Sequence, residues 1–158
     1  LKDKGFLIAL KLLGGIGQKE VGNLLSKQII AVDPNNEFIT WEQKVGLTEV
    51  AKYYHSSNIF IFASSCENMP NILIEAMASG LPIASSSSRP MPEFLENAGL
   101  YFNPANTNEI EKVVEKMLKD PGQRNKLATT SFANAKKYSW EICADKTFDF
   151  LFTLSKKS

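Results

Sequence analysis

The chain has 158 residues, of which 44% are hydrophobic and 22% are charged, and its formal net charge is +1. This length and hydrophobic content suffice for one ordinary core, so we expect a single domain. The balanced charge, without an arginine-rich patch, gives no electrostatic basis for binding nucleic acid, and we expect no such partner.

The cysteines and the apolar runs indicate the compartment. Cys66 and Cys143 lie far apart and have no metal-ligand spacing, so we expect free thiols in a reducing compartment and no metal site. No apolar run reaches the roughly 18 residues of a membrane-spanning helix, and no signal-peptide pattern is present. We therefore expect a soluble, cytoplasmic protein. The sequence begins at Leu1 rather than Met, which suggests a segment of a longer protein.

The first part of the chain is predicted to form a strand and a helix. Residues 6–13 (FLIALKLL) are an apolar strand. The glycine-rich turn at residues 14–17 fits neither common phosphate-loop motif, so it is interpreted as a strand-to-helix connection. The helix covers residues 18–30 and ends at the turn-forming residues 33–36 (DPNN). Its apolar face is expected at Val21, Leu24, Leu25 and Ile29.

A second strand and helix follow. The strand covers residues 37–41 (EFITW), and Thr48 is expected to cap a helix over residues 49–55. His55, the only histidine, suggests a nucleophile and base pair with Cys66 or Ser65. However, it closes a helix ahead of a strand, whereas ligands in such folds gather at the carboxyl ends of strands. We expect no catalytic triad.

The middle of the chain joins a buried strand to a short helix. The strand covers residues 58–63 (NIFIFA), and a polar loop leads into a helix over residues 70–79. Pro70 suits the first helical position, and Gly80 with Pro82 ends the helix. The apolar stripe of this helix is expected at Ile72, Leu73, Ala76 and Met77.

Two short strands and four helices complete the prediction. The strands cover residues 81–84 and 100–102, and the helices begin near Pro92, Asn108, Gly122 and Trp140, the last with Ser139 as its cap. The Asn108 helix ends at Lys119, the Gly122 helix at Lys137 and the Trp140 helix near Leu154. The apolar residues of the last helix, with Phe148, Leu151 and Phe152 among them, are expected to pack against this domain or a missing one rather than on a membrane.

The order of these elements predicts the fold class. Strands that alternate with helices at this spacing favour an α/β fold, a Rossmann-like parallel sheet flanked by helices.

Two acidic residues stand out beside the middle helix. Glu67 lies in the loop at its amino end, and Glu75 lies eight positions later on a face away from the apolar stripe. The free N–H groups and positive dipole end of a helix favour a phosphate. Carboxylates accept hydrogen bonds from sugar hydroxyls. Exposed glutamates are nevertheless common, so the spacing alone is not specific.

The residues around this pair carry a resemblance. The run SSCENMPNILIEAMASGLP, residues 64–82, resembles the donor-binding signature of the retaining, nucleotide-sugar-dependent glycosyltransferases with the GT-B fold (family 4, glycosyl transferases group 1). The matching residues are Ser64, Ser65, Glu67, Pro70, Leu73, Glu75, Ala76, Met77, Ala78, Gly80 and Pro82. The resemblance is strongest over residues 58–104, and it implies the C-terminal half of a GT-B fold.

The resemblance implies roles for the residues of this segment. Glu67 would hold hydroxyls of the transferred sugar at the catalytic centre, and Glu75 would hold the ribose hydroxyls. The donor-binding residues would be Asn68, Met69, Pro70 and Asn71. The backbone N–H groups of this stretch, which Pro70 lacks, would meet the sugar or the diphosphate. Arg89 is a candidate phosphate contact, and residues 85–90 would line the edge of the donor pocket. The base would be met near residues 42–45. Such enzymes need no metal or other cofactor.

Two parts of the family pattern are missing. An Arg and Lys pair on the first strand and loop of the donor domain has no counterpart, because Lys4-Gly5 is followed at once by a strand instead of a helix. Residues 1–158 are therefore expected to be one donor-binding domain that begins at its second strand. The acceptor, a glycan, lipid or small molecule, would bind an absent N-terminal domain, through which membrane association would also occur.

Two other functions stay open at this point. One alternative is a non-catalytic α/β module that binds a nucleotide or a protein partner, since a fold alone permits that. The chain also suits one half of a nucleotide-sugar epimerase, which requires further acid and base residues on a partner domain.

Overall fold

The structure is a computed structural model that describes residues 1–156. These residues belong to two compact units, Leu1–Tyr53 and a second unit that begins at Tyr54. The expectation that residues 1–158 form one donor-binding domain stays a prediction, because compact units can be parts of one domain.

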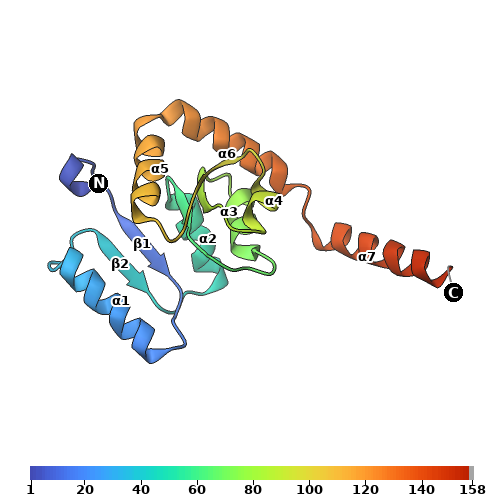
Figure 1. Cartoon of the computed structure of the whole chain (residues 1–158), viewed down its shortest axis with the longest axis horizontal. Helices are drawn as coiled ribbons and strands as arrows, with labels where there is room; N and C mark the ends of the chain where they lie inside the picture. The colour runs from blue at the N-terminus through green and yellow to red at the C-terminus, as the bar shows by residue number, and fades with distance from the viewer. Residues whose placement is uncertain (157–158) are drawn as a thin grey trace. The chain divides into compact units, whose positions relative to one another are not determined.

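The first unit is a strand–helix–strand arrangement (Figure 1). Strand β1 (Leu10–Leu13) and strand β2 (Ile39–Glu42) pair in parallel, and helix α1 (Lys19–Val32) connects them. A short 3₁₀ helix, η1 (Lys2–Lys4), precedes β1. Helix α2 (Leu47–Ser56) follows β2. A parallel pair needs such a crossover connection, so the predicted order of elements is confirmed here.

The strand predicted over residues 6–13 is shorter than expected, because pairing begins only at Leu10 opposite Ile39. The reason lies in Asp33, whose carboxylate accepts the backbone N–H groups of Glu37, Phe38 and Ile39 at 2.8, 2.9 and 2.7 Å. Burial raises the pKa of Asp33, but these hydrogen bonds outweigh it and the pKa lies below the ordinary value. The N–H groups at the start of β2 are thus bonded to the Asp33 side chain and not to a longer β1.

Two local predictions in this unit are wrong. Val21 and Leu24 are 45% and 60% exposed, because a two-stranded sheet is too narrow to cover the whole apolar face of α1. Thr48 does not cap α2, since the helix already begins at Leu47. The side chain of Glu49 instead accepts the N–H of Gly46 at 3.2 Å.

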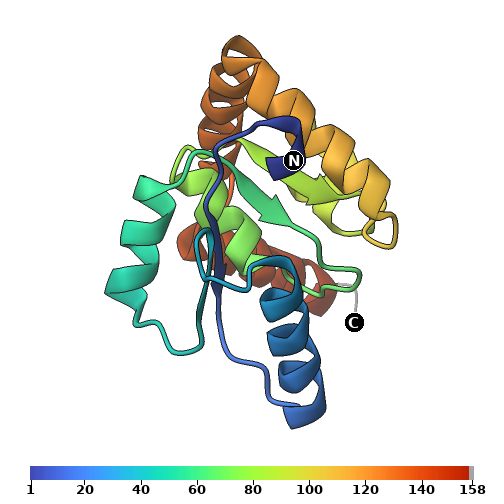
Figure 2. The same cartoon turned by 90° about the vertical axis from the view of Figure 1, so that its left-hand side faces the viewer.

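The second unit is built on three parallel strands in the order β3-β4-β5 (Figure 2). The strands are β3 (Phe60–Phe62), β4 (Ile83–Ser86) and β5 (Gly99–Phe102). The helices are α3 (Asn71–Ala78), α4 (Met91–Leu95), α5 (Thr107–Lys119), α6 (Pro121–Ala135) and α7 (Trp140–Ser155). The predicted α/β class, with parallel strands and flanking helices, is confirmed.

The central strand β4 lies two residues later than the predicted strand 81–84. All four of its residues are buried, and Ser85 and Ser86 belong to it, opposite Tyr101 and Phe102 of β5. Two of the four consecutive serines at residues 85–88 therefore belong to a core strand. The core around it contains Ala84, Phe102, Met117 and Leu127, with α5 against β5 and α3 against α6. Full burial of each large side chain contributes about 1.5–3 kcal/mol.

The last helix, α7, is capped at its amino end but buries no side chain. The Ser139 side chain accepts the N–H of Ile142 at 3.2 Å, so the predicted cap is confirmed. No residue of α7 is buried, and Phe148, Leu151 and Phe152 are 71%, 53% and 61% exposed. In Figure 1 the helix projects away from the rest of its unit. The first of the two alternatives, packing of these side chains against their own domain, is therefore wrong for the described residues, whereas packing against a missing domain stays a prediction.

Gly99 provides a test of this packing. A Cβ atom at Gly99 would clash with Cδ2 of Leu95 and lie 2.9 Å from the carbonyl oxygen of Ile83. We expect Gly99→Ala to lower the free energy of unfolding by about 1–3 kcal/mol, measured by urea unfolding. Gly17→Ala, where no atom lies within 4 Å of the added Cβ, is the control and should change it by less than about 0.5 kcal/mol. Equal stabilities of the two variants would contradict the packing around β5.

Candidate functional site

The loop between β3 and α3 is open to solvent. It follows the carboxyl end of β3, where ligands bind in parallel sheets. Asn68 and Met69 at its tip are exposed, Met69 by 47%, while Glu67 is half-buried. The hydroxyl of Ser64 donates to the carbonyl oxygen of Cys66 at 3.2 Å and shapes the start of the loop. A ligand can therefore reach the predicted donor-binding residues.

Pro70 joins this loop to the helix. It is buried and stands at the N-cap of α3, not at the predicted first helical position, because its ψ angle of 67° lies outside the helical range. Its carbonyl oxygen accepts the N–H groups of Leu73 and Ile74 at 3.0 and 3.1 Å. Among the described residues, no side chain caps this end of α3. The positive end of the helix therefore faces the loop without a protein carboxylate bonded to it.

Helix α3 turns one narrow face to the core. Leu73, Ala76 and Met77 are fully buried, as predicted, but Ile72 is 53% exposed, so its place in the apolar stripe is wrong. Because α3 has only eight residues, three side chains on one side fill its contact with the core. Gly80, with φ of 68°, ends the helix as predicted.

Glu75 is exposed on α3 and has a partner that the sequence did not identify. The hydroxyl of Tyr54, at the end of α2, donates to Oε2 of Glu75 at 3.1 Å and lies 3.4 Å from the carbonyl oxygen of Ile72. Burial and the negative charge of Glu75 raise the pKa of Tyr54 well above its ordinary value. The tyrosine therefore stays a hydrogen-bond donor. A tyrosine near the end of a helix was the available signal, but its direction depends on tertiary packing.

Glu67 and Glu75 lie on different elements, the loop before α3 and the helix itself. Glu67 lies four residues before the first residue of α3, and Glu75 is the fifth residue of that helix. The prediction that the two carboxylates hold one ligand between them stays a prediction.

A second loop leaves the same edge of the sheet. Strand β4 pairs with β3 in parallel, so residues 87–90 follow the carboxyl end next to that of β3. Arg89 has a 90% exposed side chain, and its Nε lies 3.8 Å from Oε1 of Glu93, which is a weak surface pair. The Oγ atom of Ser86 accepts the N–H of Ser88 at 3.1 Å and holds the start of this loop.

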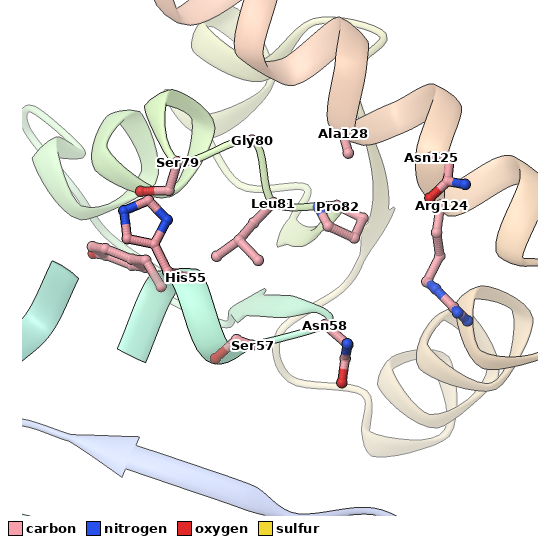
Figure 3. A pocket seen from close by; sticks show the side chains of 11 residues that line it. His55, Ser57, Asn58, Ser79, Gly80, Leu81, Pro82, Arg124, Asn125 and Ala128 are labelled. Carbon is pink, nitrogen blue, oxygen red and sulfur yellow. The ribbon is translucent and has the colours of Figure 1, made fainter. Parts of the chain in front are cut away.

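A hollow of about 280 Å³ lies at the opposite edge of this sheet (Figure 3). Its lining includes His55, Asn58 and residues 80–82, which precede β3 and β4. Figure 3 shows His55 and Arg124 on opposite sides of it. His55 is therefore at the amino ends of the strands, away from Cys66, in agreement with the expectation of no triad.

The remaining predicted features lie elsewhere. Residues 42–45, predicted near the base, begin at Glu42, the last residue of β2, and lie in the first unit. Over residues 1–156, no three His, Cys, Asp or Glu side chains come together as a metal site. Within the same range, no helix has the length and apolar character needed to cross a membrane.

Comparison with known proteins gives one family. The family model described as glycosyl transferases group 1 matches residues 9–133. The O-antigen chain mannosyltransferase B of Escherichia coli is 29% identical over 96 residues, which are 61% of this chain and 25% of that protein. A probable sucrose-phosphate synthase of Thermosipho melanesiensis is 33% identical over 108 residues, 65% of this chain and 25% of that protein. The chain thus spans about a quarter of the length of these relatives.

Solved structures share the fold. A glycosyltransferase from Rickettsia africae has a TM-score of 0.84 at 18% identity, over 99% of this chain and 42% of that chain. HepE from Anabaena, in complex with UDP and glucose, has a TM-score of 0.77 at 15% identity, over 92% of this chain and 40% of that chain. At these identities the likeness concerns the fold.

The serine-rich loop yields a stability test. Ser86→Ala leaves the N–H of Ser88 without its partner, so we expect the free energy of unfolding to fall by about 1 kcal/mol. Ser87→Ala, at an exposed position, is the matched control and should change it by less than about 0.5 kcal/mol. Urea unfolding of both variants measures the difference. A Ser87 effect as large as that of Ser86 would contradict the role given to the Ser86 hydroxyl.

Proposed function

Because the chain belongs to the glycosyl transferases group 1 family, we propose that it binds the donor of a retaining glycosyltransferase. The enzyme moves a sugar, a hexose or a close relative, from a nucleoside diphosphate to an acceptor hydroxyl. The observation that carries this proposal is the exposed loop at the carboxyl end of β3, with acidic side chains in the loop and on the helix that follows. An α/β module without catalytic function has no comparable support from the family match.

The diphosphate is placed at the amino end of α3. Backbone N–H groups of Asn68 and Met69 are the donors nearest this end, whereas the N–H of Asn71 already donates to the carbonyl oxygen of Met69 at 2.9 Å. The helix dipole favours negative charge there. The absence of a side-chain cap on α3, as far as residues 1–156 extend, supports this placement. Arg89, exposed and weakly paired, is available to the phosphates from the neighbouring loop.

The two carboxylates hold hydroxyl groups. Glu75 accepts hydrogen bonds from the ribose diol, and Glu67 accepts them from the transferred sugar. Glu67 is catalytic by holding the reacting sugar in position, since rate enhancement here rests on orientation and on stabilising the leaving diphosphate. Neither residue acts as a nucleophile, and no metal or other cofactor takes part in the proposal.

The nucleotide and the other partners follow from the same assignment. HepE, which shares the fold, was solved with UDP and glucose, and this supports a uridine or related nucleotide as the first to test. The acceptor, a glycan, lipid or small molecule, is bound by a separate N-terminal domain. The enzyme works in the cytoplasm, and any attachment to a membrane is through that domain.

Calorimetry with UDP-, GDP- and ADP-sugars tests donor binding. We expect one of them to bind the unaltered chain and Glu75→Ala to weaken that binding at least tenfold, because two hydrogen bonds to a charged group are lost. Glu20→Ala, which removes an exposed carboxylate of α1, is the control and should bind as the unaltered chain does. Binding of none of the three donors would contradict the proposal and favour a module that does not bind sugar nucleotides.

A sugar-transfer assay tests the proposal that the donor and the acceptor bind different domains. We expect the 158-residue chain alone to transfer no measurable sugar to an acceptor mixture, because neither an acceptor site nor the Arg and Lys pair of the family pattern is identified among these residues. The same assay on a protein that also contains the N-terminal domain is the positive control. Sugar transfer by the 158-residue chain would show that this proposal is wrong.

A further inference from the structure

The structure points to Tyr54 as a positioning residue for the donor site. We propose that its hydroxyl holds the Glu75 carboxylate in the orientation in which that carboxylate binds a ribose diol. This inference rests on the proposed function, since it concerns the ligand of Glu75. Tyr54 itself touches no reacting atom.

The geometry gives Tyr54 one main partner. A phenol hydroxyl carries a single proton. The Tyr54 hydroxyl lies 3.1 Å from Oε2 of Glu75 and 3.4 Å from the carbonyl oxygen of Ile72, so the carboxylate is the nearer and the charged acceptor. Such charge-assisted hydrogen bonds are the stronger kind. The Oε1 atom and the second lone pair of Oε2 remain to accept ligand hydroxyls.

The ring of Tyr54 is held by packing. Tyr54 is 8% exposed, and its ring meets that of Phe60 on β3 edge to face, with centroids 5.8 Å apart and an angle of 68° between the planes. Phe60 in turn stacks on Phe62 of the same strand, at 6.0 Å. The hydroxyl is therefore presented from a fixed side chain, as preorganisation requires.

Glu75, in contrast, is exposed and long. An exposed glutamate samples many rotamers, and fixing them costs free energy when a ligand binds. The hydrogen bond from Tyr54 removes part of that cost before the ligand arrives. Burial and the charge of Glu75 also keep the phenol protonated, so the donor is present throughout the ordinary pH range.

The test combines two residues and two ligands. The nucleoside diphosphate that the unaltered chain binds among UDP, GDP and ADP, written here as UDP, and its 2′,3′-dideoxy form are titrated calorimetrically into the full chain and into Tyr54→Phe, Glu75→Ala and the double variant. We expect Tyr54→Phe to weaken UDP binding about five- to tenfold, to leave the dideoxy ligand unaffected, and to add nothing in the Glu75→Ala background. Tyr101→Phe removes another half-buried hydroxyl, which donates to the Glu96 carbonyl oxygen, and should not change the affinity.

Each outcome decides the matter. Equal weakening by Tyr54→Phe with and without Glu75, or for both ligands, would assign Tyr54 a purely structural role and overturn the inference. If the unaltered chain binds no UDP, GDP or ADP, the proposed function fails as well. If only Glu75→Ala loses affinity for the nucleotide and Tyr54→Phe does not, the inference fails but the proposed function stands. Should Tyr54→Phe not fold, Glu75→Asp withdraws the carboxylate from Tyr54 while keeping the charge. Unchanged UDP affinity of Glu75→Asp would then overturn the inference.

Discussion

The pairing of β4 with a parallel strand on each side is the constraint on which the candidate site depends. Because β3 and β4 run in the same direction, the loops at residues 64–70 and 87–90 both leave one edge of the sheet. Burial of every residue of β4 fixes its register against slippage, since a shift by one residue would exchange its two faces. The loops at residues 64–70 and 87–90 are therefore brought to the same edge of the sheet by the pairing of β3 with β4.

The fold was largely predictable from the sequence. Apolar runs at residues 58–63 and 100–102, the turn formers at 33–36 and the helix cap at Ser139 each act locally, and the structure agrees with them. The family match and the shared fold of solved glycosyltransferases confirm the GT-B assignment. The motif at residues 64–82 was sufficient to predict the fold because several of its residues are core residues: Leu73, Ala76 and Met77 are fully buried.

What the sequence did not predict depends on contacts between distant residues. The late start of β1 follows from the Asp33 carboxylate, which accepts the N–H groups of residues 37–39 at the start of β2, and no local pattern marks that. The exposure of Val21 and Ile72 follows from how much surface the neighbouring elements offer. Tyr54 and Glu75 lie 21 positions apart in the sequence, so only the tertiary contact between the two side chains, with the Tyr54 ring packed on Phe60, reveals the pair. The roles of Glu67 and Arg89 rest on the family resemblance, because their surroundings do not mark them.

The uncovered helix α7 has a thermodynamic consequence. An isolated helix of its length is marginal in water, and without buried side chains it gains no burial free energy from the core of its unit. Its helix–coil equilibrium is then uncoupled from the cooperative unfolding of β3, β4 and β5. Heating would fray α7 gradually while the sheet still melts in one transition, and a surface that covered its aromatic rings would join the two events.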